Sequence, residues 1–85
     1  MVEVKEMELT MMAKVNSVGY NFITSRGLTH HPDDWYLQVA YGFKDLDNGQ
    51  REYAVWLYNV EYNSLSEGYY TVNQKAAIEK FWNKR

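Results

Sequence analysis

The stretch Trp35–Tyr62, WYLQVAYGFKDLDNGQREYAVWLYNVEY, decides the fold because it holds two apolar segments separated by a turn signal. In the segments 35–43 and 51–62, apolar and aromatic residues recur with the two-residue period of a β-strand. Between them stand Asn48 and Gly49, and both residue types tolerate the positive φ angles of a type I′ turn. The sequence therefore predicts an antiparallel hairpin with its tip at these two residues.

Both faces of this hairpin are rich in apolar side chains, because successive residues of a strand point to opposite faces. One face carries Trp35, Leu37, Val39, Tyr41, Phe43, Tyr53, Val55 and Leu57, and the other carries Tyr36, Gln38, Ala40, Gly42, Ala54, Trp56, Tyr58, Val60 and Tyr62. We expect the first face to pack against a helix. The second face is expected to be covered by N-terminal strands or by a second copy of the chain, or to be a recognition surface.

The N-terminal segment 5–16 has two interpretations. The odd-numbered residues from 7 to 15 are all apolar, and most residues between them are polar, which favours a strand with one solvated face. A helix is the alternative, because Val4, Met7, Met11 and Val18 fall on one helical stripe and the segment is rich in helix-forming residues. We favour the strand.

The remaining segments complete a sheet and add one helix. Residues 20–25 predict a further strand, residues 63–68 a polar turn, and residues 69–71 a short last strand. Thr71 and Gln74 fit a capping box, which predicts a helix at about 72–84. The residues expected on its packed side are Ala77, Ile78, Phe81 and Trp82.

These segments predict an α+β fold in which residues 1–85 form a single small domain. The expected architecture is a mainly antiparallel sheet of four to five strands, with one C-terminal helix packed on one face. The strand-rich part would span residues 1–71, and the helix would span about 72–84.

The composition excludes several classes of protein. No cysteine is present, which excludes disulfides, thiolate nucleophiles and cysteine-based zinc sites. The charged N-terminus lacks the apolar region of a signal peptide, and no apolar run approaches the ~20 residues of a membrane span. We therefore expect a cytoplasmic protein that does not enter membranes.

Both histidines lie in the stretch Gly27–Trp35, GLTHHPDDW, which looks like a metal or acid–base site. Adjacent residues of an extended segment point to opposite sides, so His30 and His31 are poorly placed to bind one ion together. The chain has no further histidine and no cysteine to complete a ligand set. Pro32 and the two aspartates after it suit a turn instead, and we expect neither a metal site nor a cofactor.

No known catalytic motif is present. None of the serines stands in a Gly-x-Ser-x-Gly elbow, and the five glycines are isolated rather than grouped in a phosphate-binding loop. We expect no catalytic residues, so the protein is not predicted to be an enzyme.

The aromatic residues, 16% of the chain, carry the stronger functional signal. On the second face of the hairpin we expect Tyr36, Trp56, Tyr58 and Tyr62 to be anchors for another protein, because tyrosine and tryptophan offer large rigid surfaces with a polar group. An acidic rim around them would attract a basic partner. This rim is expected to consist of Asp45, Asp47, Glu61 and Glu67.

In gross composition the chain is similar to the small inhibitors that phages and mobile elements encode against host nucleic-acid enzymes. It shares their small size, lack of cysteine, many tyrosines and acidic loops. The likeness covers no motif and assigns no residue a role. It implies a small inhibitor or regulator whose partner is another protein, and a homodimer is a second expectation.

Single-stranded nucleic acid is the alternative partner, because exposed aromatic rings can stack on bases. The basic residues available for it are Lys44, Arg51, Lys75, Lys80 and Lys84. Residues 1–71 contain ten acids and five bases, a net charge of −5, whereas residues 72–85 contain four bases and one acid, a net +3. Acids close to the aromatic residues would repel phosphates, which makes nucleic acid the second choice.

Overall fold

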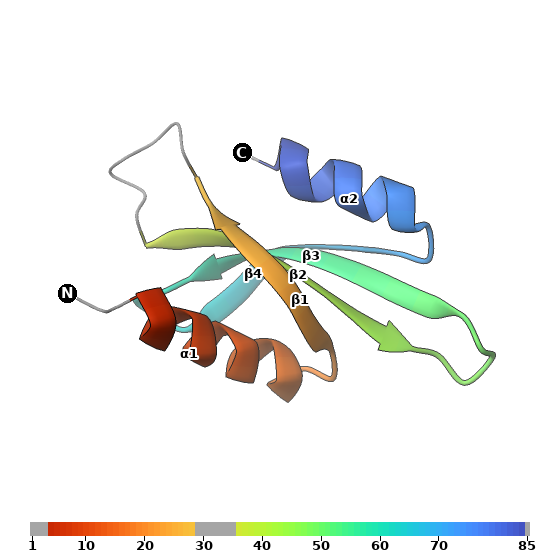
Figure 1. Ribbon diagram of the computed structural model, residues 1–85, viewed down its shortest axis with the longest axis horizontal. Coiled ribbons are helices and arrows are strands. Elements are labelled where there is room, and N and C mark those ends of the chain that lie inside the picture. Colours follow the sequence, from red (N-terminus) through yellow and green to blue (C-terminus); the bar gives the residue numbers. More distant parts are fainter. Residues whose placement is uncertain (1–3, 29–35, 85) are drawn as a thin grey trace.

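A computed structural model describes residues 4–28 and 36–84 of the chain, and it shows one antiparallel sheet with a helix on each face (Figure 1). The elements, in chain order, are α1 (Val4–Ser17), β1 (Asn21–Gly27), β2 (Leu37–Asp45), β3 (Arg51–Asn59), β4 (Ser64–Thr71) and α2 (Gln74–Asn83). The four strands lie in the order β1-β2-β3-β4. The predicted α+β class is confirmed, with four strands and with one helix more than expected.

The central hairpin is confirmed, but its turn differs from the prediction. β2 and β3 pair from Leu37 opposite Asn59 to Asp45 opposite Arg51. At the tip, the Leu46 N–H donates to the Gln50 carbonyl at 2.7 Å, and only Gly49 has a positive φ, of 87°. This is the geometry of a three-residue loop that ends in a left-handed glycine, not of the two-residue type I′ turn.

The strand predicted at 5–16 is wrong, because this segment is helix α1. Met11 and Val15 are fully buried and lie four residues apart, so they share one helical stripe. They pack on the second face of the hairpin, in a cluster with Ala40, Ala54, Trp56 and Tyr58. A helix from the same chain therefore covers this face, which removes the reason for expecting N-terminal strands or a second copy there.

Gly42 lets α1 and β1 approach strand β2 closely. A Cβ atom at this position would lie 2.8 Å from the Asn21 carbonyl oxygen and 3.3 Å from the Val15 side chain. Real Cβ atoms do not come so close to a backbone oxygen. The close packing of this layer therefore depends on the absence of a side chain in the middle of β2.

Helix α2 covers the opposite face, as expected for the first face of the hairpin. Its Ala77 and Phe81 are buried in a cluster with Val39, Tyr41, Val55 and Leu57. The prediction of a capping box at Thr71 and Gln74 is wrong. Asn73 is the N-cap, and its side-chain oxygen accepts a hydrogen bond from the Ala76 N–H at 3.1 Å. Ile78 and Trp82 are exposed, because each lies one residue, about 100°, beyond a buried position.

The C-terminal end of α2 is bound to both outer strands. From β1, the Arg26 guanidinium donates to the carbonyls of Phe81, at 2.8 Å, and Trp82, at 3.3 Å, and also to that of Lys84. The Lys84 ammonium donates at 2.9 Å to the Glu67 carbonyl of β4. The bonds from Arg26 satisfy carbonyls that the end of a helix leaves without partners.

Strand β4 is longer than predicted, because the turn before it ends at Asn63. Asn63 adopts a left-handed φ of 49°, after which residues 64–68 join the sheet rather than forming a polar turn. Both outer strands contain a register shift: in β1 it lies between Phe22 and Thr24, and in β4 it lies at Glu67, which has a φ of 51°. The strand predicted at 20–25 is confirmed as β1.

Two predictions concern segments outside this description. The turn and the two histidines at 30–34, and the start of the hairpin at Trp35, are not among the described residues.

In the part of the chain that is described, neither helix has the length and the apolar character needed to cross a bilayer.

Candidate functional site

A groove of about 360 Å³ opens on the α1 side of the sheet, between the end of α1 and strand β4. Its lining combines aromatic rings with small residues. The lining residues are Val18, Tyr20, Trp56, Leu65, Ser66, Gly68 and Tyr70. A volume of this order is within the range of pockets that bind ligands or partner side chains.

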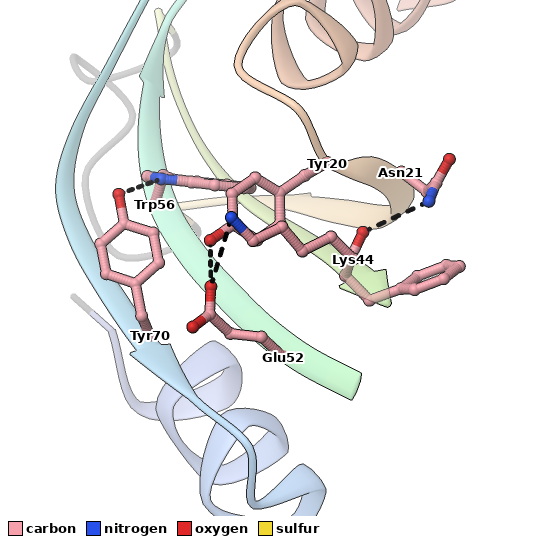
Figure 2. A network of polar contacts seen from close by, with 7 residues as sticks. Tyr20, Asn21, Lys44, Glu52, Trp56 and Tyr70 are labelled. Atoms are coloured by element: carbon pink, nitrogen blue, oxygen red, sulfur yellow. Dashed lines mark hydrogen bonds and ion pairs between the residues drawn. The ribbon is translucent and has the colours of Figure 1, made fainter. Parts of the chain in front are cut away.

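The turn before β1 and the strands β3 and β4 bring the aromatic rings of the groove together (Figure 2). Tyr20 follows the turn at Gly19, whose φ is 93°, while Trp56 lies in β3 and Tyr70 in β4. The Tyr20 and Trp56 rings meet edge to face at a centroid distance of 5.1 Å, and the Trp56 and Tyr70 rings do so at 6.2 Å. Edge-to-face contacts are favourable for aromatic rings, so these contacts stabilise the aromatic cluster that lines the groove.

Hydrogen bonds fix the polar ends of these rings. The Trp56 indole N–H donates to the Tyr70 hydroxyl at 3.0 Å, and the Tyr20 hydroxyl donates to the Glu52 carboxylate (Figure 2). The Lys44 ammonium lies 4.0 Å from Glu52 and 4.8 Å from the centre of the Tyr20 ring. Burial, and then the bond to Glu52, raises the pKa of Tyr20 well above its ordinary value, so its hydroxyl stays protonated.

Gly68 determines where the Tyr70 ring can lie. A Cβ atom on Gly68 would be only 2.4 Å from the Tyr70 hydroxyl oxygen. The phenol end of Tyr70 therefore rests against bare backbone next to the bulge at Glu67. In this position 52% of Tyr70 remains exposed, although its hydroxyl is hydrogen-bonded inside the protein.

The predicted aromatic anchors do not form one surface. Trp56 is 3% exposed and Tyr58 is fully buried, so the expectation that they are surface anchors is wrong: α1 covers the face on which they lie. The Tyr58 hydroxyl donates to Asn63 Oδ1 at 2.6 Å, which is a bond within the fold. Tyr36 is half-buried before β2, and Tyr62 is exposed in the turn between β3 and β4.

The predicted acidic rim is also divided. Asp45 and Asp47 lie at the β2–β3 tip, whereas Glu61 lies at the opposite end of these strands. Since β2 and β3 have nine residues each, the two ends are about 26 Å apart. Asp45 also accepts from Arg51 at 2.8 Å. Glu67, between the lining residues Ser66 and Gly68, is the predicted acid that lies next to the groove.

The basic residues considered for nucleic acid do not line a common channel. Lys44 contacts Glu52 and the Tyr20 ring, and Arg51 pairs with Asp45 and lies 4.1 Å from the centre of the Phe43 ring. On α2, Lys75 is exposed and Lys80 lies 5.4 Å from the centre of the Tyr69 ring. Lys84 is only 9% exposed, which is incompatible with a role as a surface base.

Sequence reasoning missed Tyr20, Tyr70 and Val18 as lining residues. The sequence did contain one indication that Tyr70 could line this face. Adjacent residues of a strand point to opposite faces, so Tyr69 and Tyr70 must supply one ring to each face of the sheet. Val18 and Tyr20 carry no such signal, since their positions depend on the helix that precedes them.

Within residues 4–28 and 36–84, no three side chains of histidine, cysteine, aspartate or glutamate come together in a way that could hold a metal ion. The site is therefore described by its aromatic rings and their hydrogen bonds. No protein-family model matches the chain, and neither the curated proteins nor the solved structures include one with significant similarity to it.

Proposed function

We propose that this protein is a non-catalytic protein-interaction module, a small inhibitor or regulator, that binds its partner in the aromatic groove. One observation carries the proposal: Tyr70 stays half-exposed beside a floor formed by Trp56, although its hydroxyl is bonded internally. Tyrosine and tryptophan contribute much of the binding energy at protein interfaces, because they bury large rigid surfaces at little entropic cost.

The polar groups of the groove favour binding over catalysis. The hydroxyls of Tyr20 and Tyr70 are both engaged in hydrogen bonds within the protein. The raised pKa of Tyr20 keeps its hydroxyl neutral, whereas a nucleophile or a general base needs a group that gives up its proton near neutral pH.

The partner that we propose is a host enzyme that acts on nucleic acid. This part of the proposal is supported by the compositional likeness to phage and mobile-element inhibitors and by the net charge of −5 over residues 1–71. Enzymes that bind nucleic acid expose basic surfaces. An acidic protein associates faster with such surfaces and is repelled by acidic ones.

The test is a selection of displayed protein fragments from the host organism on the immobilised protein. Fragments that bind in the groove should bind the Tyr70→Ala variant about 30-fold more weakly or worse, since truncation of a central anchor costs about 2 kcal/mol or more. Tyr62→Ala is the matched control, because Tyr62 is an exposed tyrosine outside the groove lining. Trp56→Ala is unsuitable, because its buried side chain supports the core.

If every selected fragment binds Tyr70→Ala as tightly as the wild type, the groove is not the binding surface and the proposal is wrong. The predicted homodimer is tested with the same variants by sedimentation, because a dimer formed through the groove would dissociate in Tyr70→Ala and persist in Tyr62→Ala.

Single-stranded nucleic acid is the alternative to a protein partner. Three of the basic residues predicted to bind nucleic acid are not available for it, which argues against this alternative. Lys44 and Arg51 contact acids and aromatic rings, and Lys84 is buried. An oligonucleotide titrated at low salt would bind at micromolar concentration or better, and more weakly as salt is added, if this alternative holds. A flat titration would eliminate it.

A further inference from the structure

The tip of the β2–β3 hairpin holds the most chemically labile pair of residues in the chain. Asparagine loses ammonia most readily where glycine follows, because glycine has no side chain to hinder attack by its own backbone nitrogen. Asn48–Gly49 is the single such pair in the sequence, and both residues are exposed. Spontaneous modification of this chain is therefore chemically easiest at Asn48.

The modification is deamidation, and water is its only co-reactant. The Gly49 nitrogen loses its proton and attacks Asn48 Cγ, so that an N–C bond forms, the Cγ–Nδ2 bond breaks and ammonia leaves. Water then opens the cyclic imide at either carbonyl and gives aspartate or isoaspartate. The first step needs a Gly49 N–H that is free to lose its proton and a carboxamide that can turn its carbon toward this nitrogen.

The folded tip opposes both requirements. The Gly49 N–H donates to the Leu46 carbonyl at 3.0 Å, which holds its proton. The Asn48 carboxamide is bonded to Gln50 at both ends: Oδ1 accepts from the Gln50 N–H at 3.0 Å, and Nδ2 donates to Gln50 Oε1 at 3.1 Å. Turning the carboxamide would break two hydrogen bonds, and freeing the nitrogen would break a third.

We infer that Asn48 is a deamidation site that the folded hairpin tip suppresses through its hydrogen bonds to Leu46 and Gln50. The reaction then occurs in molecules whose tip has opened, so its rate is that of the unfolded chain multiplied by the open fraction. Neither Asn48 nor Gly49 lines the aromatic groove, so this property is independent of the proposed function.

The product would weaken the tip that formed it. Aspartate at position 48 lacks the Nδ2 donor to Gln50 and adds a negative charge beside Asp45 and Asp47 of the same turn. Isoaspartate in addition lengthens the backbone within the loop that joins β2 to β3. One opening of the tip can thus be followed by a permanent change in it.

The experiment follows the tryptic peptide 45–51 by mass spectrometry, with its asparagine, aspartate and isoaspartate forms separated. The full chain is incubated in one mildly alkaline buffer, either folded or unfolded in guanidinium chloride. We expect conversion at Asn48 to be about tenfold slower or more in the folded protein. In the unfolded chain, Asn48 should react before Asn16 and Asn63, each of which precedes a serine.

Two variants assign the protection to the tip. Gln50→Ala removes the acceptor of Asn48 Nδ2, and it should deamidate several-fold faster than the wild type when folded and at the same rate when unfolded. Gln74→Ala is the matched control, because it removes an exposed glutamine at the start of α2. Its rates at Asn48 should equal those of the wild type in both states.

Equal rates in the folded and unfolded wild type would overturn the inference. Faster reaction in the folded protein would also overturn it, since this is the result expected if the Gln50 N–H activates the Asn48 carbonyl for attack. A folded Gln50→Ala variant that reacts no faster than the wild type would show that the bonds to Gln50 do not slow the reaction. The two states of the wild type decide the matter even if the alanine variant does not fold.

Discussion

At the scale of single residues, the tyrosines of the core differ in what their hydroxyls do. The hydroxyls of Tyr20 and Tyr58 donate to Glu52 and Asn63 respectively, but the buried Tyr41 hydroxyl has no hydrogen-bond partner among the described residues. A buried hydroxyl without a partner costs free energy, because it loses its bonds to water and gains none. Two conservative substitutions should therefore have opposite effects.

Tyr58→Phe should lower the free energy of unfolding by about 1 kcal/mol, because it leaves the amide oxygen of Asn63 without its donor. Tyr41→Phe should leave the stability unchanged or increase it, because it removes a buried hydroxyl that has no partner. Urea unfolding of both variants measures the difference. A loss at Tyr41 equal to that at Tyr58 would show that the Tyr41 hydroxyl does have a partner.

Gly42→Ala should lower the free energy of unfolding by about 1–3 kcal/mol, because its Cβ would be forced against the Asn21 carbonyl oxygen. Gly27→Ala is the matched control, since a Cβ there would meet only the Gln38 side chain, at an ordinary 3.5 Å. That variant should change stability by less than about 0.5 kcal/mol. Equal stabilities of the two variants in urea unfolding would contradict the role of close packing at Gly42.

At the scale of elements, the hairpin was predictable because its period and its turn residues indicate the same structure. Segment 5–16 was not, since its apolar residues satisfy both a two-residue and a helical period. Tertiary packing decides between the two structures. On one face of β2 and β3 the side chains are small, so that a helix can pack closely against it through Met11 and Val15. The small residues of this face are Ala40, Gly42 and Ala54. The spacing of apolar residues within one segment does not indicate the shape of the surface on which that segment will pack.

The candidate site was less predictable than the fold for the same reason. Alternation along β3 placed Trp56 on the correct face, but its exposure depends on α1, which sequence reasoning expected to be a strand. The groove joins residues from three segments, and its key ring at Tyr70 is positioned by a bulge beside Gly68. Bulges add one residue to a strand and leave no reliable mark in a short polar sequence.

The attachment of α2 to β1 gives a prediction for one element. Arg26→Met keeps the apolar stem but removes the guanidinium, so the carbonyls of Phe81 and Trp82 lose their donors. The free energy of unfolding should fall by about 2 kcal/mol, as expected for bonds to a charged donor. Hydrogen exchange should increase most in the last turn of α2.

Arg51→Met is the control for this loss, because Arg51 is an exposed arginine whose ion pair with Asp45 lies at the hairpin tip. Exposed pairs of this kind contribute little, so its stability should stay close to that of the wild type. Similar exchange rates in α2 for the Arg26 variant and the wild type would contradict the capping role.

At the scale of the whole molecule, the tyrosines link stability to alkaline pH. Burial raises the pKa of Tyr20, Tyr41 and Tyr58 above the ordinary value of 10.0. In the unfolded chain these groups lose their protons near pH 10, while in the folded protein they keep them. The unfolded state therefore binds fewer protons in this range, and the stability falls as the pH rises above about 10.

Tyr20→Phe should make this alkaline loss less steep by up to about 1.4 kcal/mol per pH unit, the value for one proton. The measurement is the free energy of unfolding in urea between pH 8 and pH 11 for the variant and the wild type. Below pH 9 the two curves should run parallel. Parallel curves above pH 10 as well would show that Tyr20 ionises equally in both states.

Both outer strands of the sheet are interrupted, β1 after Phe22 and β4 at Glu67. A straight outer strand would present an unbroken row of amide and carbonyl groups, and a second molecule could extend the sheet by adding its own strand to it. The interruptions shorten that row on both sides, so one copy is a poor template for the next. Concentrated solutions of the folded protein should consequently resist fibre growth, and thioflavin fluorescence should stay at its baseline.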